Sequence, residues 1–289
     1  MAEAIVVGSG PNGLAAAVRL ARAGVEVTVL EAADTVGGGT RSGEMVLPGL
    51  VHDRCSAVHP IAAGSPFLRE LDLGARGLRW CQPEVDCAHP LDDGSAGVFL
   101  RSFDDTEIAL GPDGARWRRL FEPLAERFDP LLAEAGQPIL HVPRHPVTLA
   151  RFGALAGLPA TTLARRWETP AARALWAGVA AHAFQRLDQV FSSAVGLMLL
   201  VAGHAEGWVV AEGGSQSIAD ALLGELQAHG GRVETGQRVT SLADLPAHDL
   251  LLLDLSPSAA AAALGDRLPA RVGRAYRRFR HGPGAFKVD

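Results

Sequence analysis

A short apolar run that leads straight into a glycine-rich turn constrains the fold of this chain more than any other feature. Residues 4–7 are apolar and mostly β-branched, and residues 8–13 read Gly-Ser-Gly-Pro-Asn-Gly. Residues 14–24 then carry apolar side chains at helical spacing and end on glycine, and residues 25–30 alternate as a second strand would. Glu31 stands at the end of that strand. This order of strand, glycine turn, helix, strand and acid is typical of the βαβ unit that binds dinucleotides.

Each residue type in this unit has a physical role. Gly8 permits the tight turn, Gly10 allows a diphosphate to approach the backbone, and Gly13 allows the helix to pack close to the strand. Glu31 is placed to accept hydrogen bonds from ribose hydroxyls, and its charge disfavours a 2′-phosphate. The alternative is an α/β edge whose glycines only form turns. The residues predicted to contact the dinucleotide in this unit are Gly8, Gly10, Pro11, Asn12, Gly13, Glu31 and Ala32.

A second glycine segment follows the acid and favours FAD over NAD. Residues 37–39 are three successive glycines, so a second stretch of backbone without side chains can lie along a diphosphate. Gly38 and Gly39 are the predicted backbone contacts, and Thr40 and Arg41 are the predicted donors. A flexible glycine loop is the alternative interpretation.

Together these two blocks, over residues 8–24 and 29–42, resemble the phytoene dehydrogenase-like FAD-dependent oxidoreductases. The nearest likeness is to the branch of pyridine nucleotide-disulphide oxidoreductase domain-containing proteins, whose flavoprotein fold is shared with amine oxidases. The resemblance continues at residues 52–60, 207–217 and 231–239. It implies that the backbone of Val239 meets the adenine, and that FAD accepts a hydride from an apolar, isoprenoid- or lipid-like substrate that is oxidised or desaturated. It identifies no catalytic side chain.

The predicted fold class is α/β: a Rossmann-like FAD-binding domain with a parallel sheet, interrupted by a mostly helical region. We expect a discontinuous FAD/NAD(P)-binding domain over residues 1–60 and 206–289, and a helical substrate or cap region over 61–205. Within that region, apolar helices over 171–187 and 191–202 either line a lipophilic pocket or form core. A run of four leucines at 250–253 is typical of a strand buried on both faces.

Composition excludes several other classes of protein. The net charge is −5 and no nucleic-acid motif occurs, so no nucleic-acid partner is expected. The longest apolar run is about ten residues, half of a membrane span, which predicts a cytoplasmic protein without an integral membrane segment. Disulfide-reductase chemistry is not expected, because Cys81 and Cys87 lack the spacing of a redox pair. No metal site is predicted, since prolines interrupt the pair His141 and His145, and His59 is interpreted as structural.

The end of the chain leaves alternatives open. Residues 282–289 read as a turn entering a strand, whereas members of the resembled family continue for a further glycine-rich segment that holds the flavin. A missing C-terminal part or a partner chain would then complete the flavin site. The first alternative function is therefore a truncated or split, non-catalytic dinucleotide-binding chain. The second is an NAD-dependent dehydrogenase.

Overall fold

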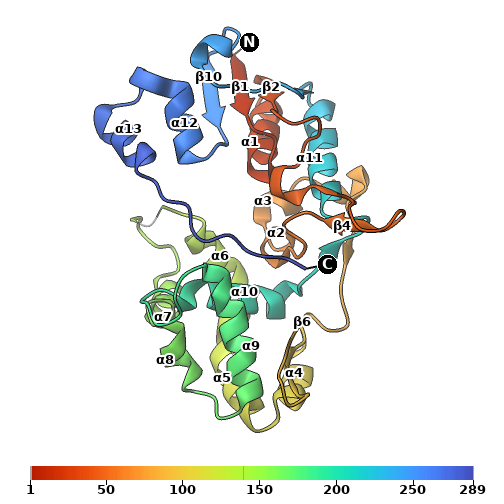
Figure 1. Cartoon of the computed structure of the whole chain (residues 1–289), viewed down its shortest axis with the longest axis vertical. Coiled ribbons are helices and arrows are strands. Elements are labelled where there is room, and N and C mark those ends of the chain that lie inside the picture. The colour runs from red at the N-terminus through yellow and green to blue at the C-terminus, as the bar shows by residue number, and fades with distance from the viewer. Residues whose placement is uncertain (1, 139, 289) are drawn as a thin grey trace.

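Residues 2–138 and 140–288 are described in the computed structural model of this chain, and they form two lobes (Figure 1). The first, the sheet lobe, is built on a parallel four-stranded sheet in the order β10-β1-β2-β9. Its strands are β1 (Glu3–Val7), β2 (Glu26–Leu30), β9 (Arg232–Glu234) and β10 (Leu250–Leu253). Strands from both ends of the chain share this sheet, so the predicted α/β class with a Rossmann-like parallel sheet is confirmed.

Two helices cover one face of the sheet because each presents an apolar side to it. Leu14, Val18 and Leu222 are at most 1% exposed. They pack in one cluster with Val6 and Val29 of the sheet. This packing holds the first turn of the N-terminal helix at the carboxyl ends of the central strands, where ligands bind open parallel sheets. The two helices are α1 (Pro11–Arg22) and α11 (Gln216–Ala228).

The opposite face of the sheet is covered more thinly. Ile5 and Leu30 pack there against Val239 and leucines of the segment around β10. The prediction that residues 250–253 are buried on both faces is wrong, because Leu250 is 42% exposed and the rest of β10 is only partly buried. Among the described strands β10 pairs only with β1, so it forms an edge of the sheet.

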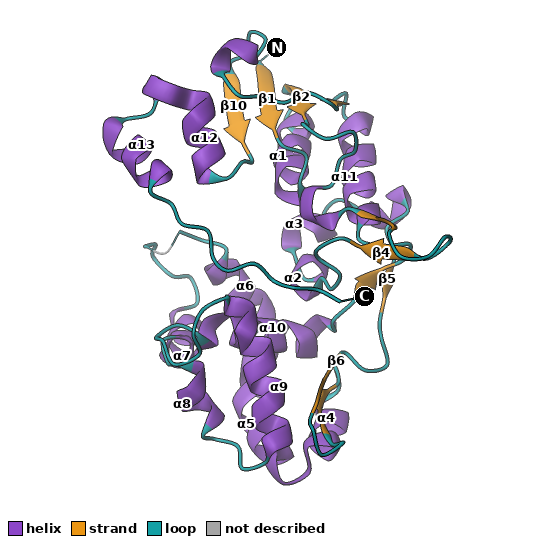
Figure 2. Cartoon of the chain, in the orientation of Figure 1, coloured by secondary structure: helices purple, strands orange, loops and turns teal. Residues whose placement is uncertain are grey.

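The second lobe, the helical lobe, consists mainly of helices (Figure 2). Trp117, Trp167 and Trp176, each at most 1% exposed, lie together in its core. The ring centroid of Trp167 lies 5.3 Å from that of Trp117 and 5.6 Å from that of Trp176. Aromatic side chains bury more apolar area than other residues, so this cluster dominates the packing of the lobe. The helices of the lobe are α4 (Phe103–Leu110), α5 (Gly114–Ala125), α6 (Phe128–Ala135), α7 (Pro146–Ala156), α8 (Ala160–Ala164), α9 (Pro170–Ala180) and α10 (Ser193–Glu206).

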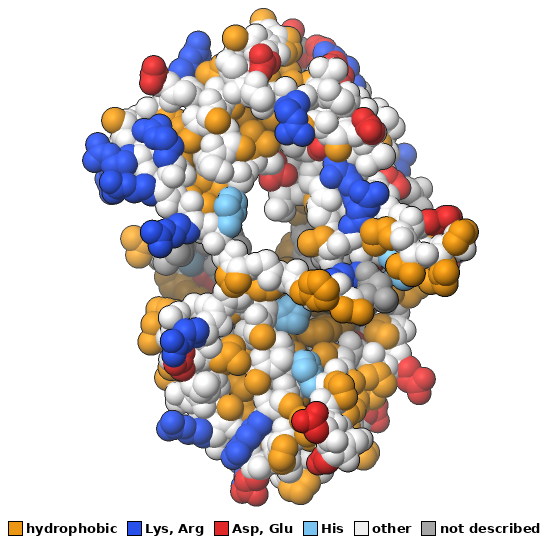
Figure 3. All heavy atoms as spheres, viewed as in Figure 1, with side chains coloured by type: hydrophobic (Ala, Val, Ile, Leu, Met, Phe, Trp, Pro, Cys, Tyr) orange, Lys and Arg blue, Asp and Glu red, His pale blue; other side chains and the backbone are white. Residues whose placement is uncertain are grey.

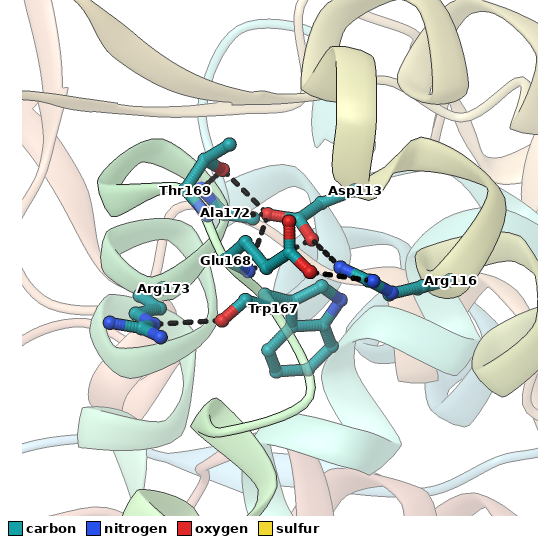
Figure 4. A network of polar contacts seen from close by, with 7 residues as sticks. All are labelled: Asp113, Arg116, Trp167, Glu168, Thr169, Ala172 and Arg173. Atoms are coloured by element: carbon teal, nitrogen blue, oxygen red, sulfur yellow. Dashed lines mark hydrogen bonds and ion pairs between the residues drawn. The ribbon is translucent and has the colours of Figure 1, made fainter.

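A buried carboxylate joins the starts of α5 and α9 (Figure 4). The Asp113 side chain is 0% exposed and accepts hydrogen bonds from the backbone N–H groups of Glu168 and Thr169 at 2.7 to 2.9 Å. The Thr169 hydroxyl also donates to Asp113 at 2.7 Å, and Arg116 donates at 3.2 Å. Since Thr169 in turn accepts from the N–H of Ala172 in the first turn of α9, one network fixes both helix starts.

The two apolar segments of this lobe differ in length from the prediction. The helix predicted over 171–187 ends at Ala180 and is followed by a short 3₁₀ turn. The next residue, Phe184, has a φ of 49°, which is incompatible with a continuing right-handed helix. The segment predicted over 191–202 becomes α10, which starts at Ser193 and runs on to Glu206. Most apolar side chains of both helices are buried in the core, which favours the core interpretation over the pocket.

Short elements connect the lobes and extend the sheet lobe, and they position the segments around the site. Among residues 2–138 and 140–288, no helix combines the length and apolar character needed to cross a membrane. The domain boundaries predicted from the sequence stay predictions. The short elements next to the site are β3 (Ser42–Glu44), β4 (Val51–Asp53), α2 (Pro60–Ala63), α3 (Pro66–Arg69), β5 (Trp80–Cys81) and β8 (Val210–Ala211). The hairpin of β6 (Cys87–Pro90) and β7 (Ala96–Phe99) packs on α9 in the helical lobe, and α12 (Pro257–Leu264) and α13 (Ala270–Arg277) follow β10.

The C-terminal segment runs between the lobes without forming a strand (Figure 1). The strand predicted over 282–289 is absent from residues 282–288, and Asp289 lies outside the described residues. A strand needs a hydrogen-bonded neighbour, and no described strand pairs with this segment. Instead the Lys287 ammonium donates to the backbone carbonyl of Asp53 at 2.5 Å.

Candidate functional site

A cavity of about 440 Å³ opens at the carboxyl ends of the parallel strands, where the turn after β1 meets the second glycine segment. Figure 3 shows the molecule hollowed between the two lobes. The cavity brings together every residue predicted to contact the dinucleotide except Gly13 and Thr40. Those that line it are Gly8, Gly10, Pro11, Asn12, Glu31, Ala32, Gly38, Gly39, Arg41 and Val239.

The glycine turn is packed too tightly for side chains. A Cβ on Gly13 would lie 2.2 Å from the backbone oxygen of Gly8 and 2.9 Å from a carboxylate oxygen of Asp254. Gly8 itself has a φ of +104°, which side chains rarely adopt. A Cβ on Gly38 would lie 3.0 Å from the Cα of Gly10, so the two glycine segments touch. Gly13 therefore does not line the cavity, but its lack of a side chain allows the start of α1 to pack against the turn that does.

The first turn of α1 offers two N–H groups to a ligand. Gly13 N–H donates to the Asp254 carboxylate at 2.9 Å, and Leu14 N–H donates to Gly10 within the helix. Pro11 has no N–H, whereas no hydrogen bond occupies the N–H groups of Gly10 and Asn12 within residues 2–138 and 140–288. Unpaired N–H groups at a helix N-terminus are suited to an anion such as a diphosphate.

Glu31 is held as a carboxylate at the rim of this cavity. It accepts hydrogen bonds from the N–H and hydroxyl of Ser9 at 2.9 and 2.5 Å, and from the N–H of Ala33 at 2.9 Å. Arg41 forms an ion pair with it at 3.1 Å. Burial acts to raise the pKa of Glu31, but these hydrogen bonds and the Arg41 charge outweigh it and lower the pKa below its ordinary value.

Thr40 has a different place from the one predicted for a cofactor donor. Its hydroxyl donates to the backbone oxygen of Gly37 at 2.8 Å, and its side chain is buried. It faces a second cavity instead of the first. Thr40 thus stabilises the conformation of the second glycine segment through this hydrogen bond.

Sequence reasoning missed Asp254, Gln237 and Arg238, which also line the first cavity. Asp254 follows directly on the leucine run of β10, and a polar residue at the carboxyl end of a parallel strand is the signal that could have located it. Gln237 and Arg238 directly precede Val239 in the segment 231–239, and their position beside that predicted contact is the signal that could have located them. They reach the cavity because the N–H of Gln237 donates to the backbone oxygen of Glu31 at 2.8 Å.

The second cavity, of about 450 Å³, adjoins the first, because Pro11 and Asn12 line both. Its walls are mainly apolar side chains from α1, α2, α3, α10 and α11. His59 is one of the few polar residues on these walls.

The other residues singled out from the sequence do not join the site. His141 pairs with Glu134 at 2.6 Å, in the helical lobe. No group of three or more potential metal ligands occurs within residues 2–138 and 140–288. Cys55 and Cys81 are exposed, and Cys87, whose pKa burial raises to about 11, is a thiol at neutral pH.

Comparison with known proteins agrees with this geometry. Residues 6–71 match a family model described as an NAD(P)-binding Rossmann-like domain. The chain is 26% identical, over 83% of its length, to a rat pyridine nucleotide-disulfide oxidoreductase domain-containing protein, of which it covers 48%. It is 30% identical to a hydroxyneurosporene desaturase of Cereibacter sphaeroides, over 56% of this chain and 34% of that protein.

Two solved structures extend the likeness over 96% of this chain. An oxidoreductase from Methanosarcina mazei is 19% identical with a TM-score of 0.62, and 64% of it is covered. A putrescine oxidase redesigned in its cofactor binding is 21% identical with a TM-score of 0.58, and 63% of it is covered. At these identities the structures establish the shared fold. The curated relatives confirm the resemblance to desaturase-like oxidoreductases, although the chain spans only about half or less of their length.

Proposed function

We propose that this chain, which shares a Rossmann-like domain with these oxidoreductases, is the FAD-binding part of a flavin-dependent oxidoreductase. One observation carries the proposal: both glycine segments and the Glu31 carboxylate line a single cavity. A diphosphate there has the free N–H groups of Gly10 and Asn12 as donors. A ribose hydroxyl would take the place of one of the donors from which Glu31 now accepts, which are Ser9, Ala33 and Arg41.

FAD fits this cavity better than NAD because the second glycine segment reaches the first. A Cβ on Gly38 would lie only 3.0 Å from the Cα of Gly10, so a diphosphate on the helix N-terminus has backbone without side chains on two sides. Arg41 also lines this cavity, and its guanidinium forms the ion pair with Glu31. FAD would supply the hydride acceptor, and the residues of this chain bind and orient it.

The substrate we propose is a small apolar molecule of the isoprenoid or lipid type, which would be oxidised or desaturated in the cytoplasm. The apolar cavity that adjoins the first one supports this choice. No side chain is assigned as an acid or base. Completion of the flavin site by a partner chain or a further segment is part of the same proposal.

The chief alternative is a non-catalytic dinucleotide-binding chain. The observation in its favour is that the chain covers only 48% and 34% of its two curated relatives. A second alternative, an NAD-dependent dehydrogenase, is consistent with the NAD(P)-binding description of the matching family model.

Thermal melting with FAD, NAD and NADP separates these functions. We expect FAD to raise the melting temperature and to show a perturbed flavin absorbance spectrum, because only FAD uses both glycine segments. NADP should protect least, since its 2′-phosphate would approach the Glu31 carboxylate. Protection by NAD and not by FAD would contradict our proposal and favour the dehydrogenase.

Glu31→Gln should weaken FAD binding about tenfold, because a hydrogen bond to a charged acceptor contributes about 1.5 to 3 kcal/mol, more than one to a neutral acceptor. Isothermal titration with FAD measures the effect. Glu26→Gln is the matched control, since Glu26 is exposed at the other end of β2. Equal FAD affinity in the two variants would show that Glu31 does not contribute to FAD binding.

A further inference from the structure

His59 and Thr40 are the buried polar residues that line the apolar cavity, and only one ring nitrogen of His59 is paired. His59 is 8% exposed and stands just before α2, with its ring centroid 6.0 Å from that of Trp80. Its Nε2 lies 2.7 Å from the hydroxyl oxygen of Ser215. The second nitrogen, Nδ1, has no hydrogen-bond partner among residues 2–138 and 140–288, and it is not one of the fully buried unpaired atoms. Nδ1 therefore keeps some accessible surface, where a ligand can reach it.

The surrounding hydrogen bonds decide which nitrogen of His59 carries the proton. The Ser215 hydroxyl lies 2.8 Å from the backbone oxygen of Ser56, which can only accept. The single hydroxyl proton of Ser215 is therefore used there, and its oxygen must accept from Nε2–H of His59. In the neutral ring this leaves Nδ1 without a proton, as an acceptor.

Two further observations keep the ring in this state. Burial lowers the pKa of His59, and the charge of Asp53 opposes that effect only in part, so the ring is neutral at neutral pH. Asp53 accepts from the N–H of Ser215 at 2.7 Å and from the hydroxyl of Ser42 at 2.6 Å, which holds Ser215 in place. Nδ1 accepts no hydrogen bond from residues 2–138 or 140–288.

We propose that His59 selects the ligand of the apolar cavity: an apolar molecule that carries one hydrogen-bond donor, such as an alcohol, with Nδ1 of His59 as the acceptor. The other walls of the cavity are mainly apolar side chains such as Val58, Phe67 and Leu222. They favour an apolar body, and one fixed acceptor then orients it. Because the cavity adjoins the proposed dinucleotide cavity through Pro11 and Asn12, the proposal rests on the proposed function for its link to a reaction.

A matched pair of probes tests the proposal. Dodecanol has a hydroxyl donor, and dodecyl methyl ether is its counterpart without one. We expect isothermal titration to give about three- to tenfold tighter binding of the alcohol to the wild-type chain, as one hydrogen bond contributes. His59→Phe should bind both probes equally. His248→Phe, at an exposed histidine, is the control and should keep the preference.

Histidine ¹⁵N NMR provides a measurement that does not depend on how the variant folds. In the wild-type chain the His59 signals should show protonated Nε2 and unprotonated Nδ1, and dodecanol but not the ether should shift Nδ1. The proposal is overturned by a protonated Nδ1, by no preference for the alcohol, by the same preference in His59→Phe, or by FAD displacing both probes. If the wild-type chain binds FAD but shows no preference for the alcohol, only this inference is contradicted. If the wild-type chain prefers the alcohol but does not bind FAD, only the proposed function is contradicted.

Discussion

Gly13→Ala is expected to abolish FAD binding and to destabilise the sheet lobe. The new Cβ would lie 2.2 Å from the backbone oxygen of Gly8 and 2.9 Å from the Asp254 carboxylate, so the start of α1 must move away from the strands. Overpacking of this kind costs about 1–3 kcal/mol, and a backbone atom cannot turn aside as a side chain can. Moving α1 also moves the N–H groups of Gly10 and Asn12 away from the diphosphate.

The control for this variant is Gly153→Ala. Gly153 is also a helical glycine, in α7, but a Cβ there would have no atom within 4 Å. Alanine favours helix over glycine by about 1 kcal/mol, so this variant should be as stable as the wild type or more so, with unchanged FAD affinity. Urea unfolding and FAD titration of both variants measure the two effects. Wild-type FAD affinity in Gly13→Ala would contradict the packing role of this turn.

Asp113→Asn is expected to cost about 3 kcal/mol of unfolding free energy without touching either cavity. The carboxylate accepts from two backbone N–H groups, the Thr169 hydroxyl and Arg116, whereas an amide has one oxygen and turns its NH₂ toward some of these donors. The buried donors then lose their partners, which is where the cost arises. Thermal and urea unfolding measure the loss.

The contribution of the Asp113 carboxylate to the free energy of unfolding is expected to decrease in acid. Burial alone would raise the pKa of Asp113, but the hydrogen bonds from Thr169 and Glu168, with Arg116, lower it below the ordinary value. A lowered folded pKa means that the stabilisation is present above the unfolded pKa of about 3.9 and is lost as the pH falls through the folded pKa. Asp113→Asn should therefore flatten the fall in stability below about pH 4.

Asp188→Asn is the control for both measurements. Asp188 pairs with Arg186 on the surface, where a pair contributes about 0–1 kcal/mol. Loss of this pair should change the free energy of unfolding by no more than that contribution. If Asp188→Asn and Asp113→Asn proved equally stable, the buried network would not be what joins α5 to α9.

Most of the first cavity could be predicted from the sequence because its parts are local. The two glycine segments and Glu31 lie within residues 8–41, and their spacing alone places them around one turn. The lengths of the helices in the middle region were less predictable. The segment 171–187 contains no stop signal at Ala180, where its helix ends. The helix from the second segment ends at Glu206, just before Gly207, whose φ of 81° makes it a stop signal beyond the predicted end at residue 202. The strand expected after residue 282 needed a neighbour that the local pattern could not supply.

By itself, the sequence determined the βαβ unit and the chemistry of its turn, because glycine spacing and helical periodicity act over a few residues. Only the tertiary structure brought Asp254 to the amide of Gly13 and Ser215 to His59, across separations of 241 and 156 residues. Such contacts follow from which strands pair in the sheet and which helices pack on it. Pairing of that kind depends on burial over the whole lobe, so no local pattern encodes it.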